Sequence, residues 1–460
     1  NVYLLPGGAP RTPSMRITKD YITFLGLTDN RRSVVLADNR GLMQGADDNG
    51  YILDVRATGF TARNLTLLNY CNVDYEYPGD PRKNLAKRSD VITQAVALQA
   101  AGDKHVYENV ALLSRLDTMF LLARRSYFKD VYIEGTDDWV GGGGISVWED
   151  CTLVFPTGSG VMSAVGIVFV RCRFEAAGGM QFYKVEFGSA DRPNVLLDCV
   201  VPVTSPQAPV AWVRGRAPAR PSQLSLTYRT KDAHGNPAVI WDGSVGEPTF
   251  AYSRELFAQE RAAFNPWNLL RAAPQTRPDD WDPAGVRAEV EAAGQGSLPF
   301  RIALGGGRPP SRTGGLGGSV GRPPSPAGPY SVRTGEPGIP ITASVTPAYA
   351  ADPAITWSTR SDWVSLSRTT GPDVVVTGRN PTDDAQWVAV NAAASNGLFA
   401  TAWVYVEPAF TDPPAVVAGP ALTSPDAGQV GVGYTLDPGG KKDRSAISWW
   451  ICDDAAGNGA

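Results

Sequence analysis

Phe128-Lys-Asp-Val-Tyr-Ile-Glu134 is one copy of a short pattern that decides the fold of this chain. Each copy places an apolar-x-apolar triplet after a polar residue, which is the alternation of a half-buried β-strand. In successive copies the fourth positions, Val110, Val131, Cys151 and Cys172, are spaced 21, 20 and 21 residues apart. The other copies are Ala62-Arg-Asn-Leu-Thr-Leu-Leu68, Tyr107-Glu-Asn-Val-Ala-Leu-Leu113, Trp148-Glu-Asp-Cys-Thr-Leu-Val154, Phe169-Val-Arg-Cys-Arg-Phe-Glu175 and Leu196-Leu-Asp-Cys199.

A step of about 21 residues is too short for a repeat of two helices, but it fits one turn of a parallel β-helix. Each strand is too small to bury its own apolar face, so the copies must stack on one another. Stacking turns the fourth positions into an inward ladder, in which the cysteines are expected to be buried free thiols. We interpret the 45-residue step from Leu65 to Val110, and the 43-residue step from Ile22 to Leu65, as two turns each.

Composition restricts the chemistry. The chain has 460 residues, with 49 Gly and 37 Pro, which favours strands and turns over long helices. A net charge of −4 excludes the basic footprint of a nucleic-acid binder. There is no run of roughly 18 apolar residues, so no membrane span is expected.

The sequence offers few residues for a zinc site or a serine triad, because it has only two histidines and no CxxC pair. Carboxylates must therefore carry any hydrolytic chemistry. Gly141–Gly144 lacks the following Lys of a phosphate loop.

The pattern also predicts an order of domains. We expect an all-β chain in which a β-helix precedes a small immunoglobulin-like β-sandwich that acts as a spacer or as a glycan-binding module. Because the chain begins within strand-like sequence, the N-terminal part of the β-helix domain is expected to be missing. The predicted segments are the β-helix over 1–250, a helical or irregular tail packing on it over 251–303, a Gly/Pro linker over 304–327, the sandwich over 328–408 and the start of a second sandwich over 412–460.

Three polar residues fall into one column of the expected β-helix. Asp117 and Asp138 are 21 residues apart, and Gln94 lies 23 residues before Asp117. Residues one turn apart lie about 4.8 Å apart, so the two carboxyls are expected to be neighbours. Two such carboxyls do not easily ionise together, which supplies an acid and a nucleophile side by side. The alternative is a structural polar ladder on the outer face, or turn-marking aspartates.

The residues around this column resemble the pectin methylesterases, a family of carbohydrate esterases. The matching motifs run without a gap from Gln94 through Asp150-Cys151, and a looser likeness covers roughly residues 1–250. The resemblance implies a right-handed, single-stranded parallel β-helix. The motifs are Gln94-Ala-Val-Ala-Leu98, Gly102-Asp103, Asn109, Leu116-Asp-Thr118, Arg125-x-Tyr127-Phe128 and Gly135-Thr-Asp-Asp-Trp139.

The resemblance also implies roles for individual residues. Asp138 would be the nucleophile that attacks the methyl ester carbonyl. Asp117 would be the general acid and then the base, and Gln94 would donate to the oxyanion. An arginine that keeps the nucleophile ionised is matched by Arg216, with Arg214 as a substitute. Trp139, which adjoins Asp138, is expected to be a sugar-stacking platform, and Arg125 and Tyr127 are expected at the substrate.

Three departures from the family pattern bear on activity. Leu116 stands where the family usually has a second Gln, and a missing oxyanion donor typically costs about 100- to 1000-fold in turnover. The Trp expected shortly after Arg216 is absent. Gly141 stands where the family has an aromatic residue, so the substrate groove is expected to be wider.

The leading hypothesis is a pectinesterase-like enzyme that hydrolyses methyl esters of galacturonate in pectin, without metal or cofactor, through an acyl-aspartate intermediate. The protein is expected to be a monomer that is secreted, periplasmic or at the cell surface. One alternative is a weakly active or inactive β-helix that binds acidic polysaccharide, as Leu116 suggests. The other is an esterase for a different pectic ester, which the altered groove would permit.

Overall fold

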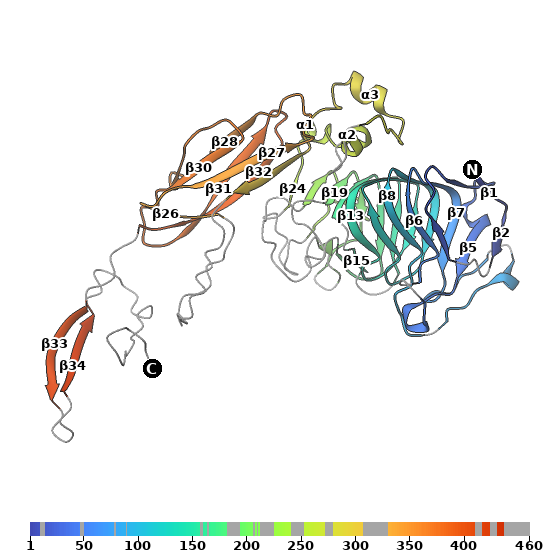
Figure 1. Ribbon diagram of the computed structural model, residues 1–460, viewed down its shortest axis with the longest axis horizontal. Coiled ribbons are helices and arrows are strands. Elements are labelled where there is room, and N and C mark those ends of the chain that lie inside the picture. The colour runs from blue at the N-terminus through green and yellow to red at the C-terminus, as the bar shows by residue number, and fades with distance from the viewer. Residues whose placement is uncertain are drawn as a thin grey trace.

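The computed structural model describes an elongated, mostly β chain (Figure 1). A long coil of parallel strands carries the N-terminal half, short helices α1–α3 follow, and two further sheets lie beyond them (Figure 1). The described residues are 1–9, 14–46, 50–77, 80–88, 90–156, 160–162, 165–181, 194–205, 208, 210–211, 225–240, 253–271, 279–306, 330–409, 416–423 and 430–436.

The turns of the coil contribute strands to three faces, and every strand pairing between turns is parallel within the described residues. We number the faces in the order in which the chain visits them. Face 1 holds β1 (Val2–Leu4), β4 (Thr23–Gly26), the first halves of β7 (Thr61–Asn69) and β9 (His105–Leu113), β11 (Arg125–Lys129), the second half of β13 (Val140–Glu149), β16 (Val165–Val170), β19 (Asn194–Leu197), β22 (Ser225–Tyr228) and β24 (Ser253–Glu255).

The other two faces complete the turn. Face 2 holds β2 (Gly7–Ala9), β5 (Val34–Asp38), the second halves of β7 and β9, β12 (Tyr132–Glu134), β14 (Thr152–Phe155), β17 (Arg173–Ala176), β20 (Val200–Val201) and β23 (Lys231–Asp232). Face 3 holds β3 (Met15–Ile17), β6 (Leu53–Thr58), β8 (Leu98–Asp103), β10 (Met119–Ala123) and the first residues of β13. In later turns β18 (Met180–Gln181) pairs with β15 (Gly160–Val161) on one side and with β21 (Val210–Ala211) on the other. The prediction of a mostly β chain built on a large parallel sheet is therefore confirmed.

The repeat pattern explains how each turn is built. The fourth positions form the inward ladder, and Cys151, Cys172 and Cys199 are free thiols that are 1 % exposed. The third positions form the corner between faces 1 and 2, where the backbone is left-handed. Asn and Asp tolerate that conformation better than most residues. These corner residues are Asn64, Asn109, Asp130, Asp150, Arg171 and Asp198, with φ between 50° and 58°.

The interpretation of the long steps as two turns was wrong. Leu65 pairs directly with Val110 in the register of β7 with β9, so 45 residues make a single turn. Likewise β4 pairs directly with β7, so the 43-residue step from Ile22 to Leu65 also joins neighbouring turns. The extra length after β7 forms an excursion, in which Tyr75 and Leu85 form an antiparallel bridge and the 3-10 helix η4 (Pro81–Lys83) lies. In the preceding turn, 3-10 helix η1 (Arg31–Ser33) connects β4 to β5, and η2 (Leu42–Gln44) connects β5 to β6.

The helical segment covers the outer side of face 1. Helix α2 (Pro266–Arg271) supplies Leu269 and Leu270 to an apolar cluster that includes Val147 and Val168 of face 1. Phe264, between helix α1 (Ala258–Arg261) and α2, belongs to the same cluster. Helix α3 (Arg287–Ala292) follows, so the tail lies between the coil and the C-terminal sheets (Figure 1). None of the helices in the described part of the chain is long and apolar enough to span a membrane.

Two four-stranded sheets share the same apolar cluster beyond the tail. One consists of β25 (Arg301–Gly306), β27 (Ile339–Thr346), β30 (Asp373–Gly378) and β29 (Val364–Leu366), and the other of β26 (Ser331–Arg333), β32 (Phe399–Glu407), β31 (Gln386–Ala394) and β28 (Ile355–Thr359). The sandwich was expected to start at residue 328, but its strand β25 lies before that residue. The immunoglobulin-like assignment stays a prediction. A hairpin of β33 (Val416–Thr423) and β34 (Val430–Leu436) lies within the segment expected to start a second sandwich.

Candidate active site

Asp117 and Asp138 occupy equivalent places on adjacent turns, at the corner that leads into face 3. The register of β10 with β13 pairs Met119 with Val140, and each aspartate comes two residues before its member of that pair. Both aspartates have a left-handed backbone, with φ of 58° and 47°. The Asp117 N–H donates to the carbonyl oxygen of Asp137 (3.3 Å), which ties the two turns together. The 21-residue spacing therefore corresponds to one turn at this corner.

Gln94 lies at the same corner, one turn before Asp117. Its bridge partner is Leu116, and the N–H of Ala95 donates to the Leu116 carbonyl oxygen (3.2 Å). Asp117 is buried at 9 % exposure, whereas Gln94 and Asp138 are half-buried. The structure thus brings the three predicted residues onto three consecutive turns, with Leu116 directly opposite Gln94.

The turn before Asp138 is held by close packing against the turn that carries Asp117. A Cβ on Gly135 would lie 2.2 Å from the Trp139 Cβ and 2.9 Å from the Thr118 Oγ1, so this position requires glycine. Thr118 Oγ1 also donates to the Glu134 carbonyl oxygen (2.7 Å). These contacts fix residues 134–139 and leave the Asp138 backbone little freedom.

The prediction that Trp139 is a sugar-stacking platform was wrong. Its side chain is 0 % exposed and packs edge-to-face on Phe155, with ring centroids 4.5 Å apart, in the core of the β-helix. Neighbouring residues of an extended segment point to opposite sides, so the residue after a corner aspartate turns inward. Adjacency to Asp138 in the sequence therefore argues against exposure.

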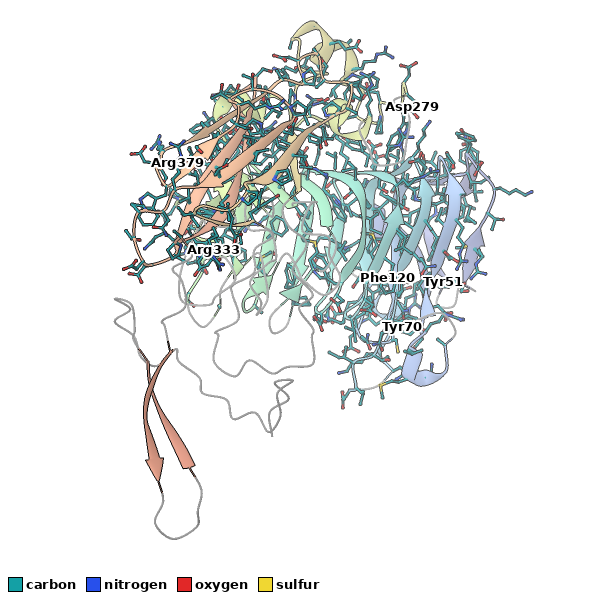
Figure 2. All side chains as sticks on the ribbon, turned by 60° about the vertical axis from the view of Figure 1, so that its left-hand side comes forward. Tyr51, Tyr70, Phe120, Asp279, Arg333 and Arg379 are labelled. Carbon is teal, nitrogen blue, oxygen red and sulfur yellow. The ribbon has the colours of Figure 1, made fainter. Side chains whose placement is uncertain are left out.

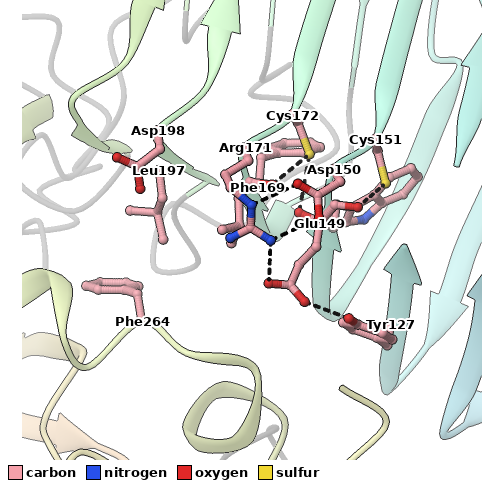
Figure 3. A network of polar contacts seen from close by, with 12 residues as sticks. Tyr127, Glu149, Asp150, Cys151, Phe169, Arg171, Cys172, Leu197, Asp198 and Phe264 are labelled. Carbon is pink, nitrogen blue, oxygen red and sulfur yellow. Dashed lines mark hydrogen bonds and ion pairs between the residues drawn. The ribbon is translucent and has the colours of Figure 1, made fainter. Parts of the chain in front are cut away.

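The prediction that Arg125 and Tyr127 bind substrate was also wrong. Both lie on β11 of face 1, where each is 2 % exposed beneath the helical tail. The Tyr127 hydroxyl donates to Glu149 Oε2 (2.6 Å), in a network that continues through Arg171 to Asp150 (Figure 3). Burial, together with the hydrogen bond to Glu149, raises the pKa of the Tyr127 hydroxyl. These side chains stabilise the interface with the tail.

Arg125 fastens the tail to the β-helix. Its guanidinium donates two hydrogen bonds to Asp103 (2.9 and 2.6 Å) and two to Asp279 (2.9 Å each), and it lies 5.4 Å from the ring centroid of Trp281. Partial burial opposes ionisation of Asp279, but hydrogen bonds from Arg125 and Lys104 outweigh it and lower the pKa of that carboxyl. Asp279 lies far from Phe120, which is on face 3 (Figure 2). Arg125 therefore acts on the side of the coil away from the aspartate column.

Replacing Arg125 tests this role. Arg125→Met should lower the free energy of unfolding by about 3 kcal/mol, because it leaves two carboxylates without their buried partner. Chemical denaturation measures the change. Arg124→Met is the matched control, since Arg124 is exposed and its replacement should change stability by less than about 0.5 kcal/mol. Equal effects of the two substitutions would contradict the role assigned to Arg125.

The glycine run after Asp138 is explained by packing between turns. A Cβ on Gly142 would lie 2.3 Å from the Leu121 carbonyl oxygen, and one on Gly144 would lie 2.1 Å from that of Ala123. The run therefore lets β13 approach the preceding turn. Arg214 and Arg216, the predicted partners of the nucleophile, lie outside the described residues.

A polar cluster on the outer side of face 3 escaped the sequence analysis. The buried carboxylate of Asp54 accepts hydrogen bonds from Arg16 Nε (2.7 Å), Arg56 Nε (2.8 Å) and Gln99 Nε2 (3.1 Å). Arg16 Nη2 also donates to the Tyr51 hydroxyl oxygen (2.6 Å). Tyr51 lies on the same side of the coil as Phe120 (Figure 2). Asp54 and Gln99 are 45 residues apart, and reading that step as one turn would have placed them side by side.

Comparison with known proteins supports the motif assignment. The family model "Pectinesterase" matches residues 83–178, the segment that contains Gln94, Asp117 and Asp138. A pectinesterase from Ralstonia solanacearum is 34% identical over 228 residues, which cover 45% of this chain and 51% of the relative. Pectinesterase 1 from Olea europaea is 29% identical over 186 residues, covering 38% of this chain and 48% of the relative. The chain therefore spans about half the length of these curated relatives.

Solved structures of pectin methylesterases are also similar to this chain. A pectin methylesterase from Yersinia enterocolitica is 19% identical, with a TM-score of 0.39, and the match covers 57% of this chain and 91% of that one. One from Aspergillus niger is 16% identical, with a TM-score of 0.38, over 54% of this chain and 83% of that one. The family model and the curated relatives confirm the resemblance inferred from the motifs, and residues 83–178 match the pectinesterase family model.

Proposed function

We propose that this protein hydrolyses methyl esters of galacturonate in pectin, with Asp138 as nucleophile and Asp117 as acid and base. The observation that carries the proposal is the arrangement of Gln94, Asp117 and Asp138 on three consecutive turns of one corner. The family match over the same residues supports it. A secreted or periplasmic location fits a polysaccharide substrate.

The chemistry runs in two halves. The Asp138 carboxylate attacks the ester carbonyl carbon, and the tetrahedral oxyanion accepts a hydrogen bond from the Gln94 amide. Asp117 donates its proton to the departing methoxide, so methanol leaves and an acyl-aspartate anhydride remains. Asp117, now a carboxylate, takes a proton from water as it attacks the anhydride, which releases the galacturonate and regenerates both groups. Asp117 is the more buried of the two, which suits the partner that begins protonated. Arg216 or Arg214 would hold Asp138 ionised.

Methanol release from highly methylated pectin tests this function directly. Release by the wild type, without acetate release from acetylated pectin, supports the proposal. Acetate release without methanol release would favour an esterase for another pectic ester. Leu116 favours a second candidate, a polysaccharide binder with little turnover. Equal binding of pectin by wild type and by Asp117→Ala/Asp138→Ala protein, with turnover in neither, would support that candidate.

Leu116→Gln should raise kcat by about 10-fold. A well-placed oxyanion donor is worth about 100- to 1000-fold, and a newly introduced amide recovers part of that. Leu116 lies opposite Gln94 in the register and immediately before Asp117, so an amide there is within reach of the same oxyanion. Steady-state methanol release measures the gain, and Leu116→Met, which adds no donor, is the control. A rise in kcat in both variants would mean that the shape of the side chain at position 116, and not a hydrogen bond to the oxyanion, causes the gain.

A further inference from the structure

We propose that Thr93 is a positioning residue that sets the orientation of the Gln94 side-chain amide, an inference that rests on the oxyanion role proposed for Gln94. An amide group has one oxygen that accepts and one nitrogen that donates, and the two ends have nearly the same shape. Only one of the two orientations presents N–H groups to an oxyanion. The site must therefore contain a group that distinguishes the oxygen from the nitrogen.

The hydroxyl of Thr93 is such a group. Thr93 Oγ1 accepts the N–H of Met43 (3.1 Å) and donates to Gln94 Oε1 (3.4 Å). The Met43 N–H can only donate, so it occupies a lone pair of the hydroxyl and leaves the hydroxyl proton for an acceptor. That proton is satisfied when the oxygen of the Gln94 amide faces Thr93. The Gln94 nitrogen, which carries the N–H groups, is then directed away from Thr93.

Thr93 is itself held rigidly. It is 1 % exposed, its N–H donates to Asn72 Oδ1 (3.1 Å), and its carbonyl oxygen accepts from Asn72 Nδ2 (2.6 Å). The turn that supplies Met43 is packed tightly on it, because a Cβ on Gly41 would lie 2.6 Å from the Thr93 Cγ2. The Leu42 N–H of the same turn donates to the Gln94 carbonyl oxygen (3.0 Å). Backbone and side chain of Gln94 are thus fixed by one connected group of residues.

The arrangement on the next turn increases the importance of this contact. Leu116, the bridge partner of Gln94, has no polar side-chain atom to orient the amide. A site with one side-chain donor in place of two depends more strongly on that donor's orientation. A polar neighbour that orients a functional group in this way commonly tunes its effect without touching the substrate.

Thr93→Val tests the proposal, since valine keeps the shape and removes the hydroxyl. We expect kcat for methanol release to fall about 3- to 10-fold, the effect of one ordinary hydrogen bond, with KM changed by less than about 2-fold. Thr93→Ser retains the hydroxyl and should restore most of kcat. In a Gln94→Ala background, Thr93→Val should cause no further loss, because the group it orients is gone. The same loss in both backgrounds would mean that Thr93 only stabilises the fold and would overturn the proposal.

A second measurement does not need activity, so it separates failure of this inference from failure of the proposed function. The Gln94 side-chain NH2 signals of ¹⁵N-glutamine-labelled protein are identified by their absence in Gln94→Ala. With the amide oxygen facing Thr93, these protons should show no strong nuclear Overhauser effect to the Thr93 methyl group, and Thr93→Val should shift or broaden them. A strong effect in the wild type would place the nitrogen against Thr93 and overturn the inference, even in a protein that releases no methanol.

Discussion

Asp138→Asn is expected to lower methanol release from highly methylated pectin by about 10⁴-fold or more, to the background of the assay. The amide has nearly the shape of the carboxylate but no negative charge, so it is a poor nucleophile for the ester carbonyl. Binding depends on the groups around the site, so pectin should still bind with similar affinity. Methanol release by wild type and variant between pH 5 and 9, together with a pectin-binding measurement, checks both expectations.

The corner between faces 1 and 2 offers a matched control for that substitution. Asp150 has the same left-handed backbone as Asp138, with φ of 56° against 47°, but it is exposed and paired with Arg171. Asp150→Asn should therefore leave methanol release within about 2-fold of wild type. Full methanol release by Asp138→Asn would show that the nucleophile lies elsewhere.

Much of the β-helix could be predicted from the sequence because its physical cause is local. The polar third position and the apolar fourth position recur in each copy, and the structure turns them into a left-handed corner and an inward ladder. The 45-residue step was misread because spacing alone does not separate two turns from one turn with an insertion. The bridge between Tyr75 and Leu85, which makes that excursion, has no periodic signal.

The site residues divide in the same way. Asp117 and Asp138 could be placed from their spacing, because one period leads to the same corner of the next turn. The burial of Arg125 and Tyr127 could not be predicted from spacing, because a tail more than a hundred residues away covers them. Asp279 of that tail accepts a hydrogen bond from Arg125. Their position in the motif predicted contact with substrate, but both lie on face 1, where the tail buries them away from the aspartate column.

Gln94→Ala is expected to lower kcat by about 100- to 1000-fold while KM changes little. The Gln94 amide acts on the oxyanion, which exists only in the tetrahedral intermediate and the transition states beside it, so its loss should not weaken binding of the ester. Because Leu116 supplies no donor on the next turn, the loss should lie toward the upper end of that range. Initial rates of methanol release over a range of pectin concentrations separate kcat from KM.

Gln99→Ala is the matched control, because it removes the same side chain from the same turn. Gln99 lies five residues beyond Gln94 and donates to Asp54, so its loss should reduce stability and leave kcat within about 2-fold of wild type. A fall in kcat of less than 10-fold for Gln94→Ala would mean that another donor stabilises the oxyanion, and the site would then have to be rebuilt around that donor. A loss in the expected range would instead make Gln94, oriented by its own neighbours, the group on which turnover in this Leu116 site depends.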